Sequence, residues 1–184
     1  MTIAPQMLLT VDEFLASAAE REGKWELEDG VPLCMSAERL GHVRTIHAAV
    51  YALNAALRSA GLECEAVPDS VGVRISKRTS YQPDALIYCG PRLPSETLEV
   101  SNPIVAIEVL SRSTAVRDQS VKIAGYFSVL SVMHYLILSP ESRMVVHHKR
   151  GQGDLIETRI LREGPLRLDP PGLELQAQDL FAPE

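Results

Sequence analysis

Residues 103–114, PIVAIEVLSRST, place a carboxylate inside a segment that otherwise has the composition of a buried strand. Between residues 104 and 110, every side chain is apolar except that of Glu108. A strand that is apolar on both faces is typical of the centre of a sheet that is covered on both sides. A buried carboxylate is costly unless a cation or a hydrogen-bond network compensates its charge. The segment therefore predicts a central strand and a partner for Glu108.

The segments before this strand predict two helices and a hairpin. Thr10 and Glu13 have the spacing of a capping box, which predicts a short helix ending near Glu22. An Asp-Gly pair predicts a hairpin over residues 24–35. Apolar side chains three and four residues apart predict a long helix over residues 41–61.

The segments after the long helix determine the expected fold. They are strands at residues 71–75, 81–89 and 103–110, a helix from about Thr114, a strand at 133–139 and a hairpin over 143–161. The apolar face of that helix is expected to hold Val116, Ile123, Phe127 and Leu130. Because the helix can connect two parallel strands, we expect a mixed central sheet. The sequence thus predicts one α/β domain over residues 1–184, with a core of helix, three strands, helix and strand, and with an added N-terminal helix and hairpins.

The composition narrows the functional classes. The chain of 184 residues has a formal net charge of −6, which argues against a large basic surface for nucleic acids. It has no apolar run near the ~20 residues that span a bilayer and no signal-peptide pattern at its start. Its three cysteines lack a Cys-x-x-Cys pair, which argues against a disulfide framework and favours a reducing cytoplasm.

Asp84 supplies a second carboxylate, at the start of the strand that precedes the Glu108 strand. Because side chains alternate along a strand, the two carboxylates meet on one face if these strands are neighbours. Carboxylate oxygens suit Mg²⁺, which is usually held by one or two carboxylates together with water and phosphate oxygens. The pair therefore predicts a Mg²⁺ site, with Mn²⁺ as a substitute.

These motifs resemble those of the PD-(D/E)XK nuclease superfamily, through QPDALIY at residues 82–88 and IEVLSRST at 107–114. More closely, the chain resembles the Uma-type family of bacterial proteins grouped as restriction endonucleases. The matching segments are WELEDG, a histidine on the next helix, AIEVLSRST, RDQSVKIAGY and VMHYLILSP. This resemblance covers residues 25–140, and it implies a restriction-endonuclease-like fold and metal-dependent cleavage of DNA.

The resemblance also implies further site residues. The simplest superfamily pattern has a lysine two residues after Glu108, where this chain has Leu110. The family pattern has its lysine on the following helix, where it matches Lys122. Glu26 matches an acidic residue in the first strand and would be an accessory metal ligand. His42 would contact a ligand residue or the phosphate.

Two hypotheses about function follow. The first is a Mg²⁺-dependent DNA endonuclease in which Asp84, Glu108 and Lys122 are catalytic, acting as a cytoplasmic homodimer without membrane contact. The second is a binding or assembly module that keeps the nuclease fold without catalysis.

Each residue also has a purely structural interpretation. Glu108 could pair with Lys122 or Arg117 without a metal, since buried ion pairs are often structural. Lys122 alone would be a solvated helix residue paired with Asp118, four residues earlier. Tyr126, on the same helix face, is expected to pack, with its hydroxyl reaching the edge of the site at most. Glu26 could equally lie on the surface of the hairpin, and a histidine in the position of His42 is more often a helix-surface residue than a catalyst.

Overall fold

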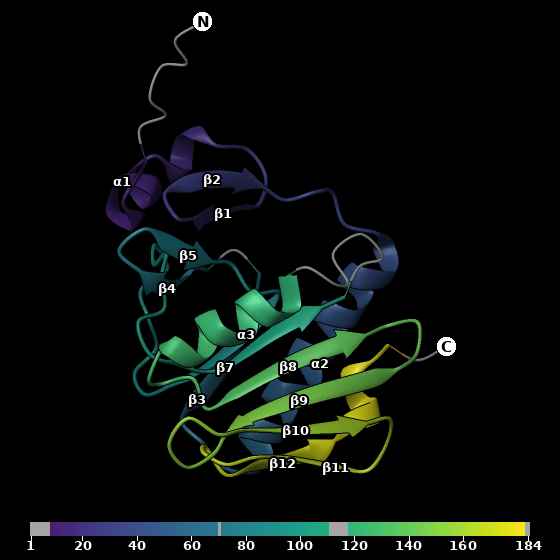
Figure 1. The fold of residues 1–184 in the computed structure, drawn as a ribbon. Coiled ribbons are helices and arrows are strands. Elements are labelled where there is room, and N and C mark those ends of the chain that lie inside the picture. Colours follow the sequence, from purple (N-terminus) through teal and green to yellow (C-terminus); the bar gives the residue numbers. More distant parts are fainter. Residues whose placement is uncertain (1–7, 70, 111–117, 183–184) are drawn as a thin grey trace, which may run out of the picture.

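The centre of the protein is a six-stranded mixed sheet with the strand order β10-β9-β8-β7-β6-β3 (Figure 1). The structure is a computed structural model that describes residues 8–69, 71–110 and 118–182. The strands of this sheet are β3 (Cys64–Pro68), β6 (Ala85–Cys89), β7 (Pro103–Val109), β8 (His134–Ser139), β9 (Met144–Arg150) and β10 (Ile156–Leu161). β7 is parallel to β8, and the other neighbours are antiparallel. The mixed α/β sheet that the sequence predicts is therefore confirmed.

Helices cover both faces of this sheet (Figure 1). The covering elements are α2 (Leu40–Ser59), α3 (Asp118–Ser128), the hairpin of β11 (Pro165–Leu168) and β12 (Leu173–Gln176), and the 3-10 helix η2 (Ala177–Leu180). On one face, α2, the hairpin and η2 share one apolar cluster with the sheet. On the other face, α3 connects β7 to its parallel neighbour β8 and packs in a second cluster. The expected crossover helix is thus present.

The long helix α2 forms as its apolar spacing predicts. Ile46, Leu53 and Leu57 are buried against the sheet. Gly61 follows the helix with a φ of 65°, a left-handed conformation that glycine adopts at little cost. No helix in the described part of the chain is both long and apolar enough to cross a membrane.

A second, four-stranded sheet has the order β2-β1-β5-β4 and lies beside α3 (Figure 1). Its elements are β1 (Trp25–Glu28), β2 (Val31–Cys34), β4 (Val73–Ser76) and β5 (Thr79–Tyr81), with α1 (Val11–Ala16) and the 3-10 helix η1 (Ala18–Glu20) packed nearby. Thr10 and Glu13 form the predicted capping box. The helix is shorter than predicted, because α1 ends at Ala16 and continues only as the 3-10 turn of η1, short of Glu22.

The predicted strand at residues 71–75 is present as β4, but its assignment as the first strand of the core is wrong. β3 occupies that position and pairs with β6. β4 pairs instead with β5, and the two form a hairpin of the small sheet inserted between β3 and β6 in sequence. β3 has a weak sequence pattern because it is an edge strand in which only Ala66 is buried. The insertion attaches the small sheet to the central sheet just before Asp84.

The prediction from the cysteines is also wrong. Cys64 of β3 and Cys89 of β6 are register partners and form a disulfide. The odd count concealed this pair, because the third cysteine, Cys34, is free and exposed. Disulfides are rare in cytosolic proteins, so the pairing gives no support to the expected reducing compartment.

The crossover helix α3 matches its predicted apolar face only in the middle. Thr114 and Val116 lie outside the described residues. Ile123 and Phe127 pack in the core beside the sheet. Leu130, by contrast, is 85% exposed, because α3 ends two residues earlier at Ser128.

Candidate active site

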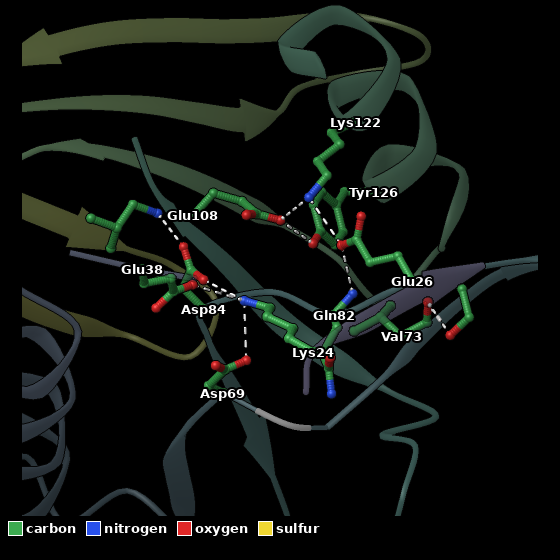
Figure 2. Close-up of polar contacts among 12 residues, drawn as sticks. Lys24, Glu26, Glu38, Asp69, Val73, Gln82, Asp84, Glu108, Lys122 and Tyr126 are labelled. Atoms are coloured by element: carbon green, nitrogen blue, oxygen red, sulfur yellow. Dashed lines mark hydrogen bonds and ion pairs between the residues drawn. The ribbon is translucent and has the colours of Figure 1, made fainter. Parts of the chain in front are cut away.

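Charged side chains from several elements meet where β6 begins and β7 ends (Figure 2). Asp84 immediately precedes β6, and Glu108 lies near the end of β7. These two strands are antiparallel neighbours, as the convergence of the two carboxylates requires. Glu26 comes from β1 of the small sheet, and Lys122 comes from α3. The cluster therefore joins both sheets and the crossover helix.

Glu108 has the partner that its apolar surroundings demand. Lys122 Nζ lies 2.9 Å from its Oε1, and the Tyr126 hydroxyl donates to the same oxygen at 2.7 Å. Burial raises the pKa of Glu108 to about 7, the Lys122 ammonium opposes this rise, and the carboxylates of Asp84 and Glu26 add to it. Tyr126 is fully buried and bonds a predicted site carboxylate directly, so its hydroxyl reaches further than the edge of the site.

Lys122 connects Glu108 to Glu26. Its Nζ lies 3.0 Å from Glu26 Oε1 and 5.6 Å from the centre of the Tyr81 ring. Burial lowers the pKa of Lys122, but the two carboxylates outweigh burial and raise it overall. Glu26 Oε1 also accepts a hydrogen bond from the Gln82 backbone N–H at 2.9 Å. The ammonium is therefore charged and held between two fixed carboxylates.

Asp84 is buried and ionised. The Val109 backbone N–H donates to its Oδ2 at 2.7 Å, and Lys24 Nζ lies 2.5 Å from its Oδ1. Burial alone would raise the pKa of Asp84, but contacts with His42 and Lys24 outweigh burial and lower it to about 2. Because Val109 directly follows Glu108, the hydrogen bond from its N–H fixes the two carboxylates relative to each other.

Lys24 belongs to the site, and the sequence analysis missed it. Besides contacting Asp84, its Nζ lies 3.1 Å from Asp69 Oδ1 and 3.7 Å from Glu38 Oε1. A signal was available, because Lys24 stands two residues before Glu26 and side chains two apart share one face of a strand. Glu38 gave no comparable signal, since it lies in an irregular segment ahead of α2.

His42, in the first turn of α2, lies next to Asp84 Oδ2, whereas Lys24 contacts Oδ1. Its Nε2 is 3.1 Å from Glu38 Oε1 and 3.3 Å from Asp84 Oδ2, yet neither oxygen lies where the ring N–H would donate a well-directed hydrogen bond. Burial lowers the pKa of His42, but the adjacent Asp84 and Glu38 carboxylates outweigh burial and raise it. Ligand atoms of Glu38, His42 and Asp84 lie within 4.8 Å of one another, so this group can hold a metal ion.

The structure brings the five predicted site residues into this one region: Glu26, His42, Asp84, Glu108 and Lys122. Glu26 and His42 are buried rather than on the surface. The ion pair of Glu108 with Lys122, one of the structural alternatives, is present. Arg117 and the side chain of Asp118 lie outside the described part of the chain.

Among the described residues, the cluster has more negative than positive groups. Five carboxylates contact two ammonium groups, namely those of Glu26, Glu38, Asp69, Asp84 and Glu108 with Lys24 and Lys122. Counted formally, with every carboxylate ionised and His42 neutral, the cluster has three more negative than positive charges. The raised pKa values of Glu108 and His42 make its net charge less negative near neutral pH. Oxygens of this kind are the ligands that Mg²⁺ prefers, and imidazole adds a nitrogen ligand for softer metals. The residues present therefore fit a divalent cation.

Comparisons with known proteins agree with this fold. The crystal structure of a protein from Anabaena variabilis, described as a putative nuclease belonging to DUF820, matches with a TM-score of 0.72 at 19% identity, covering 94% of this chain and 97% of that chain. An uncharacterized protein of Synechocystis sp. is 25% identical over 181 residues, which are 97% of this chain and 94% of the relative. Residues 11–181 match the Uma2 family, described as "Putative restriction endonuclease". The chain therefore belongs to the Uma2 family.

Proposed function

We propose that this protein is a Mg²⁺-dependent endonuclease that hydrolyses phosphodiester bonds of DNA. One observation carries the proposal. Lys122, on the crossover helix, places its ammonium 2.9 Å from Glu108 and 3.0 Å from Glu26. The chain lacks a lysine at position 110, and Lys122 brings the missing charge to the same carboxylate from another element.

Asp84 and Glu108 would hold Mg²⁺, or Mn²⁺ in its place, with Glu26 as the accessory ligand. When bound, such an ion makes water a nucleophile near neutral pH and offsets the charge of the reacting phosphate. The Val109 N–H and Lys24 keep the Asp84 carboxylate oriented and ionised. The Tyr126 hydroxyl orients Glu108 by donating to its Oε1, the oxygen that also contacts Lys122.

Lys122 would orient and polarise the attacking water by donating an N–H of its ammonium to the water oxygen. Its two carboxylate partners keep the ammonium charged and directed toward the cluster rather than toward solvent. Positioned groups of this kind contribute about 10²–10⁴-fold to a rate. Lys24, a second buried ammonium, would attract the phosphate to the site.

The test is cleavage of several forms of DNA with Mg²⁺ or Mn²⁺ by the parent and by Glu108→Gln. The matched control is Glu157→Gln, which removes an exposed carboxylate from β10 of the same sheet. We expect cleavage by the parent and by the control and none by Glu108→Gln. Equal cleavage by Glu108→Gln would refute the proposed site. A folded parent that cuts no DNA form with either metal would favour the binding or assembly module.

The active form is proposed to be a homodimer, because a double-strand cut needs two sites and two-fold pairing is the commonest closed assembly. A single chain with a net charge of −6 also offers little general affinity for DNA. Light scattering should give twice the mass of the chain at working concentrations. A monomer with full cleavage activity would exclude this assembly.

A further inference from the structure

The immediate surroundings of His42 do not satisfy its ring. The side chain is 8% exposed, and both ring nitrogens lack a hydrogen-bond partner. Nevertheless, Nε2 lies 3.1 Å from Glu38 Oε1 and 3.3 Å from Asp84 Oδ2. A buried nitrogen this close to two carboxylate oxygens normally donates to one of them, because an unmade buried hydrogen bond is costly.

These separations match those between ligands that share a metal ion. Bonds of about 2.0–2.1 Å place neighbouring ligand atoms about 3.0 Å apart in an octahedron and about 3.4 Å apart in a tetrahedron. The two distances from Nε2 fall inside this interval. The three ligand atoms are within 4.8 Å of one another, so they can face a common point.

The chemistry of the three donors indicates which ion fits. Two carboxylate oxygens suit any hard or borderline dication. Imidazole nitrogen binds Zn²⁺ and other transition-metal ions readily, whereas Mg²⁺ is held by oxygen ligands and water. A site with one nitrogen and two oxygens should therefore discriminate against Mg²⁺.

We propose that Glu38, His42 and Asp84 form a second cation position, which takes a transition-metal dication such as Mn²⁺, Co²⁺ or Zn²⁺ in preference to Mg²⁺. It shares Asp84 with the position next to Glu108, and it rests on the proposed function only through that shared residue. His42 lies in the first turn of α2, and Glu38 lies four residues earlier, in the irregular segment just before the helix.

Lys24 opposes the ion electrostatically. Its Nζ lies 2.5 Å from Asp84 Oδ1 and 3.7 Å from Glu38 Oε1, so it shares two of the proposed ligand residues. Removing this positive charge should strengthen cation binding, while removing a ligand should weaken it. The two kinds of substitution therefore have opposite signs.

The experiment is a titration of the metal-free protein with Co²⁺, followed by visible absorption and calorimetry without DNA. Its variants are His42→Ala, Glu38→Gln and Lys24→Met, and the matched control is His47→Ala, an exposed histidine on the same helix. We expect at least a tenfold weaker affinity and an altered spectrum for His42→Ala. Glu38→Gln should bind Co²⁺ more weakly than the parent, Lys24→Met should bind it more tightly, and His47→Ala should bind it like the parent. Zn²⁺ and Mn²⁺ should displace Co²⁺ at concentrations at which Mg²⁺ does not.

Circular dichroism would show whether each variant is folded. If His42→Ala is unfolded, Glu38→Gln still tests the inference, because Glu38 precedes α2 and is partly exposed. A parental spectrum and affinity in folded His42→Ala or in Glu38→Gln would overturn the inference. Glu108→Gln separates it from the proposed function, since that variant should lose DNA cleavage and keep the histidine-dependent Co²⁺ signal.

Discussion

The two faces of the central sheet bury polar groups in contrasting ways. On the α3 face, Glu108 is embedded among ionised partners. On the α2 face, His134 of β8 and His147 of β9 lie side by side, with their ring nitrogens 2.9 Å apart, and they are 0% and 3% exposed. Burial lowers the pKa of His134 to about 4 and that of His147 to about 3. The α3 face therefore holds a charged carboxylate cluster, whereas the histidine pair on the α2 face is neutral.

The hydrogen bonds of the histidine pair, His134 and His147, determine its protonation. His134 Nε2 lies 2.9 Å from the Pro170 carbonyl oxygen, which can only accept, so this nitrogen donates. His134 Nδ1 then accepts from His147 Nε2. The pair is satisfied by neutral rings, apart from the buried His147 Nδ1.

The difference shows what distinguishes a candidate site from a structural polar contact. The neutral pair completes its main hydrogen bonds within the fold and has no charge for a ligand to compensate. The charged cluster retains excess negative charge and an imidazole whose neighbours do not satisfy it. Perturbed groups of the second kind are typical of functional sites.

Substituting Lys122 should produce the largest change. Lys122→Met should reduce DNA cleavage about 10²–10⁴-fold in single-turnover assays, because it removes the group proposed to orient water. Metal binding should persist, because the carboxylate ligands remain. The control Lys77→Met removes an exposed lysine and should cut normally.

A second-site change sharpens this test. Leu110 lies two residues after Glu108, so Leu110→Lys in the Lys122→Met background should restore part of the activity. If Lys122→Met cleaves DNA at the parental rate, the charged cluster is a structural contact, as the histidine pair is.

Metal binding should give the next largest effect, and only on the charged face. Mg²⁺ or Mn²⁺ at 100 times its Kd should stabilise the native protein by about 2.7 kcal/mol, seen as a higher Tm. Glu108→Gln should abolish the Mg²⁺ shift, whereas His147→Met should leave it intact. A Mg²⁺ shift that survives in Glu108→Gln would mean that Mg²⁺ binds elsewhere.

The smallest effect is the pH dependence of stability in metal-free buffer, which should have opposite signs for His147 and Glu108. His147 has a folded pKa below its ordinary 6.5, so its stabilising contribution is present above pH 6.5 and is lost as pH falls toward about 3. Glu108 has a folded pKa of about 7, above its ordinary 4.5, so its contribution is present below pH 4.5 and is lost as pH rises through 7.

Urea unfolding of the parent, His147→Met and Glu108→Gln between pH 4.5 and 7 measures both contributions. Each group should change the free energy of unfolding by no more than about 1.4 kcal/mol per pH unit. Compared with the parent, His147→Met should lose less stability on acidification, and Glu108→Gln should lose more. Parallel curves for all three proteins would contradict the contrast between the faces.

The sequence predicted those parts of the site that strand and helix periodicity determine. The lone carboxylate among apolar residues located β7 and required a partner for Glu108. Four-residue spacing placed Lys122 and Tyr126 on one helix face, and both contact that carboxylate. These predictions succeeded because they depend on local geometry within a single element.

Features that depend on contacts between distant segments were missed. Lys24 and Asp84 are 60 residues apart in sequence. The spacing of Lys24 from Glu26 indicates a shared strand face, but it does not reveal the contact with Asp84. The assignment of β3 failed for a related reason, since an edge strand needs little apolar alternation and its pairing with β6 is set by the whole sheet. The histidine pair was not predicted, because it joins side chains of two different strands and neither strand alone indicates the contact.

The ion pair between Glu26 and Lys122 spans 96 residues of chain, which has a consequence for the growing polypeptide. Synthesis proceeds at about 5–20 residues per second, so the small hairpin leaves the ribosome many seconds before α3 does. During that interval Glu26 lacks the ammonium that neutralises it, whereas Glu108, which precedes Lys122 by 14 residues, lacks it only for about the last one to three seconds. Until Lys122 arrives, repulsion between the two carboxylates disfavours bringing β1 against β7. A partially synthesised chain is thus kept from assembling the cluster, and any hydrolytic activity arises only once the crossover helix has emerged.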